Sequence, residues 1–218
     1  MSSCKKKIII SGPAPPLFDY GGPIRSLSSF YKEFSQDFFI LWISINKFHN
    51  GKNLINDKHK EIIYTKNEFL KIIVKSKKGD TIWLNSFFEL KTLLLPFLLI
   101  NNKIIISPRG QLADKAISTS NYFMKYIFIK IFKIVQNRVV FHSTGIEETL
   151  NITNTFHSKV FEIPNLFKME YDFNSCYDKK IVFFSRISRK KGLLDFLEIY
   201  SKIKTNITID IFGYIEDE

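Results

Sequence analysis

The sequence alternates between short isoleucine- and valine-rich segments and longer segments whose apolar residues recur at helical spacing. Residues 5–11 are rich in isoleucine and end before a Gly-Pro pair, which is typical of a buried strand followed by a turn. Residues 24–34 place Leu27, Tyr31 and Phe34 on one face of a helix. Because strands joined by helices pair in parallel, this alternation predicts an α/β fold: a mostly parallel sheet with helices on both faces.

The alternation continues along the rest of the chain. Strands are expected over residues 5–11, 38–45, 61–64, 81–85, 103–107, 138–141, 160–163, 181–184 and 207–212. Helices are expected over residues 24–34, 68–75, 87–100, 121–135, 145–150 and 191–202. The polar segment 168–180 predicts a linker between a domain at 1–167 and a second region at 181–218. That second region holds only strand, helix and strand, which is too little for an independent core.

Composition indicates a globular protein. Of 218 residues, 45% are apolar and 24% are charged, which suffices for a buried core. Two cysteines, Cys4 and Cys176, argue against a disulfide framework and a cysteine-based zinc site, and fit a reduced compartment. The apolar run after Lys7 ends at Ser11, too soon for a secretory signal. The longest apolar stretch, 92–100, is too short to span a membrane, so a cytoplasmic protein is expected.

The charge balance is strongly basic. Lysine and arginine number 32 and aspartate and glutamate 21, which gives a net charge of +11. Lysine is spread over most of the chain, so a solvated surface is the simplest interpretation, with anionic lipid or a phosphorylated ligand as alternatives. The lysines and aromatics of 121–133 suit either a membrane interface or a core-facing helix. Because no zinc finger, RNA-binding signature or arginine-rich run occurs, no nucleic acid partner is expected.

A glycine pair lies between the first predicted strand and its helix. Gly21 and Gly22 allow the backbone to approach a ligand, and the helix that follows offers free N–H groups to an anion. The alternative is a simple turn with Pro23 near the helix start.

A second candidate follows the strand at 103–107. In Ser107-Pro108-Arg109-Gly110, the arginine comes at the carboxyl end of a strand, where open α/β sheets bind ligands. Arg109 suits a phosphate or a sugar hydroxyl. Taken alone, the segment is better explained as an arginine in a Pro-Gly turn.

A third candidate follows the strand at 138–141. Ser143 or Thr144 is expected to cap the next helix, with Glu147 completing a capping box. His142 is interpreted as a packed histidine at the strand end rather than as a general base. No HExxH or GxSxG motif occurs in the sequence, and His49, His59 and His157 lack metal-ligand spacing.

A fourth candidate spans residues 185–192. Arg186 leaves a strand and Lys191 opens a helix, which places two cations beside a helix N-terminus and suits a diphosphate. The alternative is a basic surface loop. Neither the Walker phosphate loop nor the dinucleotide glycine fingerprint is present.

In their order along the chain, these segments resemble the retaining GT-B glycosyltransferases of family 4. Residues 106–112 resemble the family's SPRGML segment, with Gln111 in place of methionine. Residues 140–147 resemble its strand-to-helix entry, and 162–165 resemble the Pro-Asn end of its first domain. Residues 184–192 resemble its GRlxxxKG segment, with Ser185 in place of the first glycine, and 209–213 resemble the strand end that follows.

The resemblance implies a GT-B-like fold: a complete Rossmann-like N-terminal domain on the acceptor side, and an incomplete second Rossmann-like domain for the nucleotide-sugar. It implies transfer of a sugar, with retention, to a saccharide or lipid-linked saccharide in capsule, O-antigen or exopolysaccharide synthesis. Arg186, Lys191, Gly21 and Gly22 would bind the donor diphosphate. Arg109, with His142, Ser143 and Glu147, would face the acceptor side. No cofactor and no metal are expected. A cytoplasmic location is expected, with a peripheral position at the inner face of the cell membrane as the alternative.

The family's second domain continues beyond the segment that matches Gly213. It supplies the base pocket, a pair of glutamates and the last helices, which pack back on the first domain. The chain therefore resembles a C-terminally truncated enzyme. The alternatives are a non-catalytic remnant or a split-enzyme subunit that needs a partner chain, and a basic module for lipid or nucleic acid.

Overall fold

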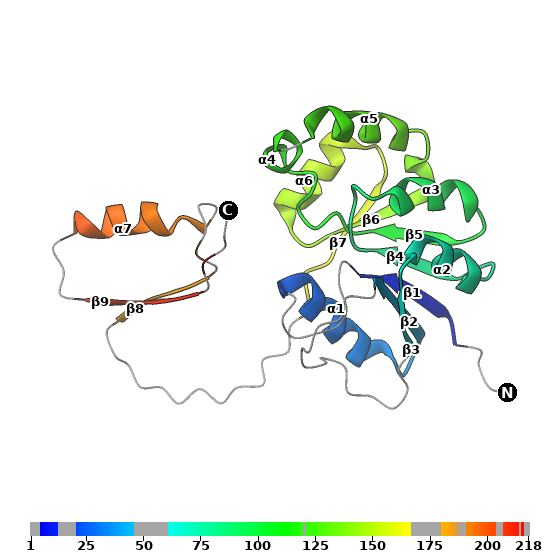
Figure 1. Cartoon of the computed structure of the whole chain (residues 1–218), viewed down its shortest axis with the longest axis horizontal. Coiled ribbons are helices and arrows are strands. Elements are labelled where there is room, and N and C mark those ends of the chain that lie inside the picture. The colour runs from blue at the N-terminus through cyan, green and yellow to red at the C-terminus, as the bar shows by residue number, and fades with distance from the viewer. Residues whose placement is uncertain are drawn as a thin grey trace. The chain divides into compact units, whose positions relative to one another are not determined.

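The computed structural model describes residues 5–12, 21–45, 61–119, 121–166, 180–185, 187, 191–203, 207–213 and 215. The chain divides into two compact units, Met1–Met169 and Glu170–Glu218 (Figure 1). Each unit is described by itself.

The first unit contains the seven strands that the sequence predicts, each within two residues of its expected bounds. They are β1 (Lys7–Ser11), β2 (Phe39–Ile45), β3 (Glu61–Thr65), β4 (Thr81–Leu84), β5 (Lys103–Ile106), β6 (Val139–Ser143) and β7 (Lys159–Glu162). Its helices are α1 (Gly21–Phe34), α2 (Glu68–Lys75), α3 (Leu90–Leu98), α4 (Asp114–Ser118), α5 (Tyr122–Phe132) and α6 (Ile146–Thr155), with a 3₁₀ turn at Gln136–Arg138. The short helix α4 is not among the predicted elements.

All neighbouring strands of this sheet pair in parallel, in the order β3-β2-β1-β4-β5-β6-β7. The predicted parallel α/β sheet is therefore confirmed, and the strand order is that of a Rossmann-like fold. The chain moves outward from β1 in one direction through β2 and β3, and from β4 in the other direction through β5 to β7.

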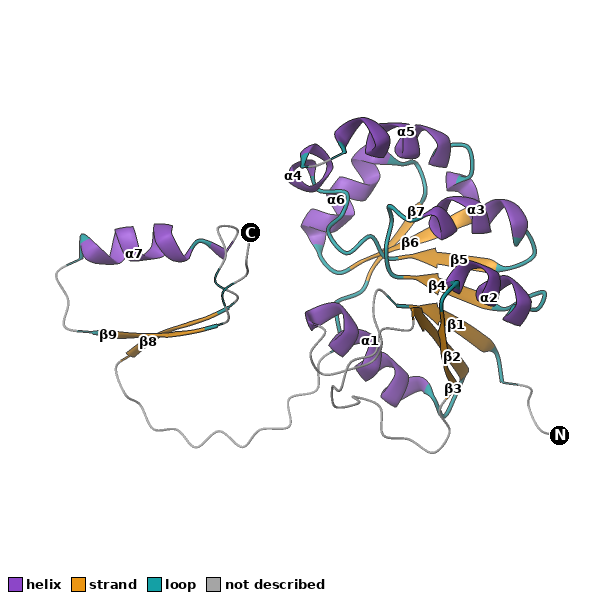
Figure 2. Ribbon diagram, in the orientation of Figure 1, coloured by secondary structure: helices purple, strands orange, loops and turns teal. Residues whose placement is uncertain are grey.

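Helices pack on both faces of the sheet (Figure 2). On one face, Leu27 and Tyr31 of α1 pack against Ile10 of β1 and Trp42 of β2. On the other face, a larger core brings together α2, α3, α5 and α6. Its centre is a cluster of phenylalanine rings, whose centroids lie 4.9 to 6.2 Å from that of Phe87. Successive residues Ile9 and Ile10 enter different cores, as the period of a strand requires.

The second unit contains two parallel strands and a helix. These are β8 (Lys180–Phe184), α7 (Leu193–Ser201) and β9 (Thr208–Phe212). Gly213, directly after β9, lies very close to the backbone of Ser185. A β-carbon at Gly213 would lie 1.7 Å from the backbone oxygen of Ser185. Only glycine fits at this position, because the obstacle is backbone that cannot move aside alone.

No helix in the described part of the chain combines the length and the apolar character needed to cross a membrane.

Candidate functional site

The carboxyl ends of the strands of the first unit carry buried polar side chains. Ser11 ends β1, Asn85 follows β4, Ser107 follows β5 and Ser143 ends β6, and each is at most 2% exposed. The neighbours β1 and β4 form the point at which the chain order of the strands reverses. Open parallel sheets bind ligands at the carboxyl ends of their strands beside such a point. This edge is therefore the candidate functional site.

Arg109 lies in the turn after β5 and reaches across the edge. Its Nη2 and Nε donate hydrogen bonds of 2.9 and 3.3 Å to Oδ1 of Asn85, and its Nη1 donates one of 2.8 Å to Oδ1 of Asn165. Burial lowers the pKa of Arg109, and nearby Glu148 opposes that shift. The guanidinium nevertheless remains charged at neutral pH, because its ordinary pKa is so high.

The backbone at Arg109 is in the left-handed region, with φ of 54°. For a residue other than glycine this conformation costs on the order of 1–3 kcal/mol. Gly110 follows with φ of 77°, and its N–H donates to Oε1 of Glu148 at 2.8 Å. The bonds to Asn85, Asn165 and Glu148 therefore hold a strained turn in place, a feature that is concentrated at ligand sites.

Asn165 joins this turn to α1. Besides the bond from Arg109, its Oδ1 accepts a hydrogen bond of 2.8 Å from Oγ of Ser26. Two donors fill both lone pairs of the amide oxygen. The segment after β7 is also fixed by the N–H of Ile163, which donates to the carbonyl of Ser143 at 2.9 Å. The Pro-Asn segment thus brings α1, β6 and the arginine turn together at one edge.

His142 lies at the end of a chain of hydrogen bonds. Nε1 of Trp83 donates to Oγ of Ser107 at 2.8 Å, and Oγ of Ser107 lies 2.7 Å from Nδ1 of His142. Nε2 of His142 lies 3.0 Å from the carbonyl oxygen of Ile163. Because a carbonyl only accepts, Nε2 carries the proton and Nδ1 accepts from the serine hydroxyl. Burial and the charge of Arg109 lower the pKa of His142, against weaker opposing effects of Ile163 and Glu148.

Both ring nitrogens of His142 are thus occupied, and the ring is neutral at physiological pH. The interpretation of His142 as a packed histidine at the strand end agrees with this geometry. It orders the edge of the sheet and is not a free general base.

The predicted capping box at the start of α6 does not form, because the N-cap residue is Gly145 and it has no side-chain cap hydrogen bond. Oε2 of Glu148, not of Glu147, accepts from the backbone N–H of Thr144 at 2.8 Å and from its hydroxyl at 2.9 Å. The helix begins at Ile146, later than expected, so the third helical position falls on Glu148. Glu147 is exposed, and Oγ of Ser143 bonds to Thr149 at 2.7 Å instead of capping the helix.

Gln111 fixes the segment between β4 and α3. Its Oε1 accepts hydrogen bonds from the backbone N–H of Phe87 at 2.5 Å and of Phe88 at 3.2 Å. The helix α3 begins at Leu90 rather than at residue 87 as predicted. Gln111 stands where the family's segment has methionine, and this change to a polar residue was a sign of its hydrogen-bonding role. The sequence analysis did not draw that inference.

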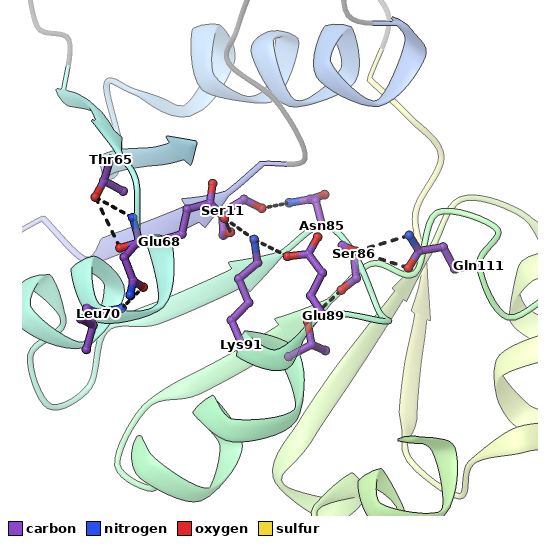
Figure 3. A network of polar contacts seen from close by, with 11 residues as sticks. Ser11, Thr65, Glu68, Leu70, Asn85, Ser86, Glu89, Lys91 and Gln111 are labelled. Atoms are coloured by element: carbon purple, nitrogen blue, oxygen red, sulfur yellow. Dashed lines mark hydrogen bonds and ion pairs between the residues drawn. The ribbon is translucent and has the colours of Figure 1, made fainter. Parts of the chain in front are cut away.

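A buried ion pair that was not predicted lies beside Ser11 (Figure 3). Glu68 of α2 and Lys91 of α3 are 5% and 7% exposed. Lys91 bonds to Oε2 of Glu68 and lies 2.6 Å from Oε2 of Glu89. Ser11 donates to Oε2 of Glu68 at 3.3 Å, while Oε1 of Glu68 has no hydrogen-bond partner in the described part of the chain. Burial raises the pKa of Glu68, and Lys91 partly offsets the rise.

Two of the predicted diphosphate-binding residues begin α1. Gly21 is its first residue, three residues before the predicted start. A β-carbon at Gly22 would contact none of the described residues within 4 Å. The loop that precedes Gly21, from residue 13 to residue 20, lies outside the described residues.

The predicted pair of cations belongs to the second unit. Lys191 is exposed just before α7, and Gly192 forms its N-cap with φ of 68°. Arg186 lies outside the described residues. The structure therefore does not test whether the two cations converge, and their role stays a prediction.

An apolar groove of about 700 Å³ runs along the face of the sheet that carries α1. Phe30 of α1, Trp83 of β4, Val140 of β6 and Phe161 of β7 line it, and His142 lies at its wall. Parallel sheets are usually covered by helices on both faces. In the described part of the chain, α1 packs over β1 and β2 on this face, and the groove follows the strands beyond.

Within the described residues, no group of three histidine, cysteine, aspartate or glutamate side chains is placed to hold a metal ion. The fold and the edge define the class: a Rossmann-like α/β protein with an arginine-centred polar site at the carboxyl ends of its strands. No protein-family model matches the chain, and no curated protein is significantly similar to it in sequence.

Proposed function

We propose that this chain is a retaining glycosyltransferase of the GT-B fold, of the family 4 type. It would transfer a sugar from a nucleotide-sugar to a saccharide or lipid-linked saccharide during surface polysaccharide synthesis. The observation that carries the proposal is the strained turn of Arg109, held by Asn85 and Asn165 at the carboxyl edge. This turn is the segment that resembles the family's SPRG motif.

The division of the chain supports the same proposal. The first unit is a Rossmann-like domain, and the second begins again with a parallel strand–helix–strand arrangement. In the proposed enzyme, the first unit binds the acceptor and the second begins the donor-binding domain. Gly213, which the packing of the second unit requires, ends the last segment that resembles the family.

The groove on the first unit gives further support. The resemblance implies that the last helices of the second domain pack back on the first domain. A groove lined by Phe30, Trp83 and Phe161 is an apolar surface that such a helix would cover.

The proposed chemistry needs cations at the leaving group. Negative charge grows on the diphosphate as the bond to the sugar breaks, and fixed cations stabilise that charge. Arg186 and Lys191 are assigned this role. Gly21 and Gly22, at the start of α1, are assigned to the donor phosphates, since glycine lets the backbone approach a ligand. Arg109 would bind hydroxyl groups on the acceptor side, where its planar fork suits two acceptors at once.

The test is calorimetric titration of nucleoside diphosphates into the full chain. The Lys191→Ala and Arg186→Ala variants are expected to bind roughly tenfold or more weakly, because each loses charge-assisted bonds to phosphate. Lys202→Ala is the matched control, since Lys202 follows the same helix and pairs with Glu198 on the surface. Equal affinity in the wild type and in both test variants would contradict the assignment.

A second candidate is a non-catalytic remnant or a subunit of a split enzyme. It is favoured by large apolar side chains that the second unit leaves exposed, among them Phe184 at 84%, Ile215 at 73% and Leu194 at 71%. Such side chains are expected to contact further polypeptide. Turnover of a nucleotide-sugar by the purified chain alone would exclude this candidate.

A further inference from the structure

The helix α5 is apolar on its outer side as well as on its inner side. Phe132 is buried in the core and Phe128 packs against it. On the other side, Phe123 is 71% exposed, and Ile134 just beyond the helix is 74% exposed. A helix at the surface of a soluble domain normally presents polar residues outward, so the outer side of α5 fits an apolar partner.

The neighbouring helix α3 continues this surface. The ring of Phe88, just before α3, lies 5.6 Å from the ring of Phe128 in α5. Nζ of Lys125 lies 5.7 Å from the centre of the Phe88 ring. The two helices lie side by side on one face of the sheet (Figure 1). We call their exposed residues the α3–α5 surface: Leu90, Phe97, Leu98, Ile100, Tyr122, Phe123, Met124, Tyr126, Ile131 and Ile134.

The charges within α3 and α5 themselves have one sign, although Glu89 precedes α3 and Asp114 lies on the neighbouring helix α4. Lys130 of α5 and Lys133 at its C-cap are exposed, and Nζ of Lys130 lies 4.6 Å from the centre of the Tyr126 ring. No acidic residue occurs in the sequence of 90–98 or of 122–133. Two copies of the chain that met through this surface would bring lysine toward lysine, which disfavours self-association.

An anionic bilayer matches both properties of the surface. Apolar and aromatic side chains enter the boundary between headgroups and acyl chains, while lysines contact lipid phosphates. We propose that the α3–α5 surface docks the chain on anionic lipid membranes. This docking does not depend on the proposed transferase activity, although a membrane is where a lipid-linked acceptor would be found.

The test is co-sedimentation of the full chain with phosphatidylcholine vesicles, with and without phosphatidylglycerol. The wild type is expected to bind the anionic vesicles and to bind less at high salt. Lys130→Gln with Lys133→Gln should weaken binding about twenty-five-fold, at about fivefold for each lysine. Phe123→Ser with Ile134→Ser should weaken binding by roughly tenfold or more, because two apolar side chains no longer leave water.

Matched controls change exposed residues of the same kind elsewhere in the first unit. Ile146→Ser with Leu150→Ser alters α6, and Lys77→Gln with Lys78→Gln alters the turn before β4. Both pairs should leave binding unchanged. Tryptophan fluorescence during unfolding verifies that each variant is folded.

Three results would overturn the proposal. The first is no binding of the wild type to anionic vesicles. The second is a loss in the control pairs as large as the loss in the test pairs. The third is a dimer in solution that Phe123→Ser with Ile134→Ser dissociates, because the surface would then bind a second copy of the chain.

Discussion

Among single residues, Lys91 is expected to have a large effect on stability. It is the cation beside Glu68, whose carboxylate is buried and whose pKa is raised by that burial. Because the folded state holds the proton of Glu68 more tightly than the unfolded state does, the fold loses stability as this group ionises. The loss begins near the unfolded pKa of 4.5 and continues as pH rises through the higher pKa of the folded state. Lys91→Met removes the compensating charge, so it should cost about 3–5 kcal/mol at neutral pH and clearly less near pH ~5. Urea unfolding followed by tryptophan fluorescence measures this, since Trp42 and Trp83 both lie in the first unit.

Two companion variants separate the pair from its surroundings. Glu89→Gln removes the more exposed partner of Lys91, at 35% exposure, and should have little effect. Glu68→Gln combined with Lys91→Met removes the buried charge as well, and should recover part of the loss. An equal loss for Lys91→Met at both pH values would show that ionised Glu68 is not the cause.

Local sequence patterns predicted the positions of single residues unevenly. Arg109, His142 and Ser143 were expected at the carboxyl ends of strands, and they are found there. Glu68 and Lys91 were not predicted, because the partners are 23 residues apart and come together only through the packing of α2 and α3. A lysine inside an otherwise apolar helical segment was the one local sign of this pair.

At the scale of elements, the start of α2 offers a defined capping bond. Oδ1 of Asn67 accepts a hydrogen bond of 3.1 Å from the N–H of Leu70. Asn67→Ala should therefore destabilise the first unit by about 1 kcal/mol, whereas Asn67→Ser keeps an acceptor and should cost only a few tenths. The same urea unfolding measures both. If the alanine and serine variants are equally stable, the cap does not contribute to the stability of the unit.

Strands were easier to predict than helix ends. Each strand is a short β-branched run bounded by turn residues, and this pattern is local. The end of α6 was placed at Leu150, but the helix continues to Thr155. The residues that follow Leu150 have weak helix propensity, and Ile152 is held in the core. Packing against the sheet extends the helix beyond its local preference.

At the scale of the whole molecule, the alternation of strand and helix patterns along the sequence predicted the class of the fold. It did not predict the order of the strands in the sheet. The pairing of β1 with β4 joins residues more than seventy positions apart, and no local pattern specifies it. That pairing creates the reversal point at which Ser11 and Asn85 meet, where the N–H of Asn85 donates to the carbonyl of Ser11 at 3.1 Å. The site was therefore predictable as a set of strand ends, and its geometry was not.

The two units are expected to differ in their capacity to fold alone. Both core clusters of the first unit are built from its own residues, and its size is typical of an independent domain. Residues 1–169 expressed alone should therefore keep the tryptophan-monitored urea midpoint of the full chain. Residues 170–218 expressed alone should show no cooperative transition by circular dichroism, because two strands and one helix bury too little apolar surface. A lower midpoint for 1–169 would mean that the first unit draws stability from the rest of the chain. A cooperative transition in 170–218 would mean that the second unit has a sufficient core despite the exposure of Phe184 and Leu194.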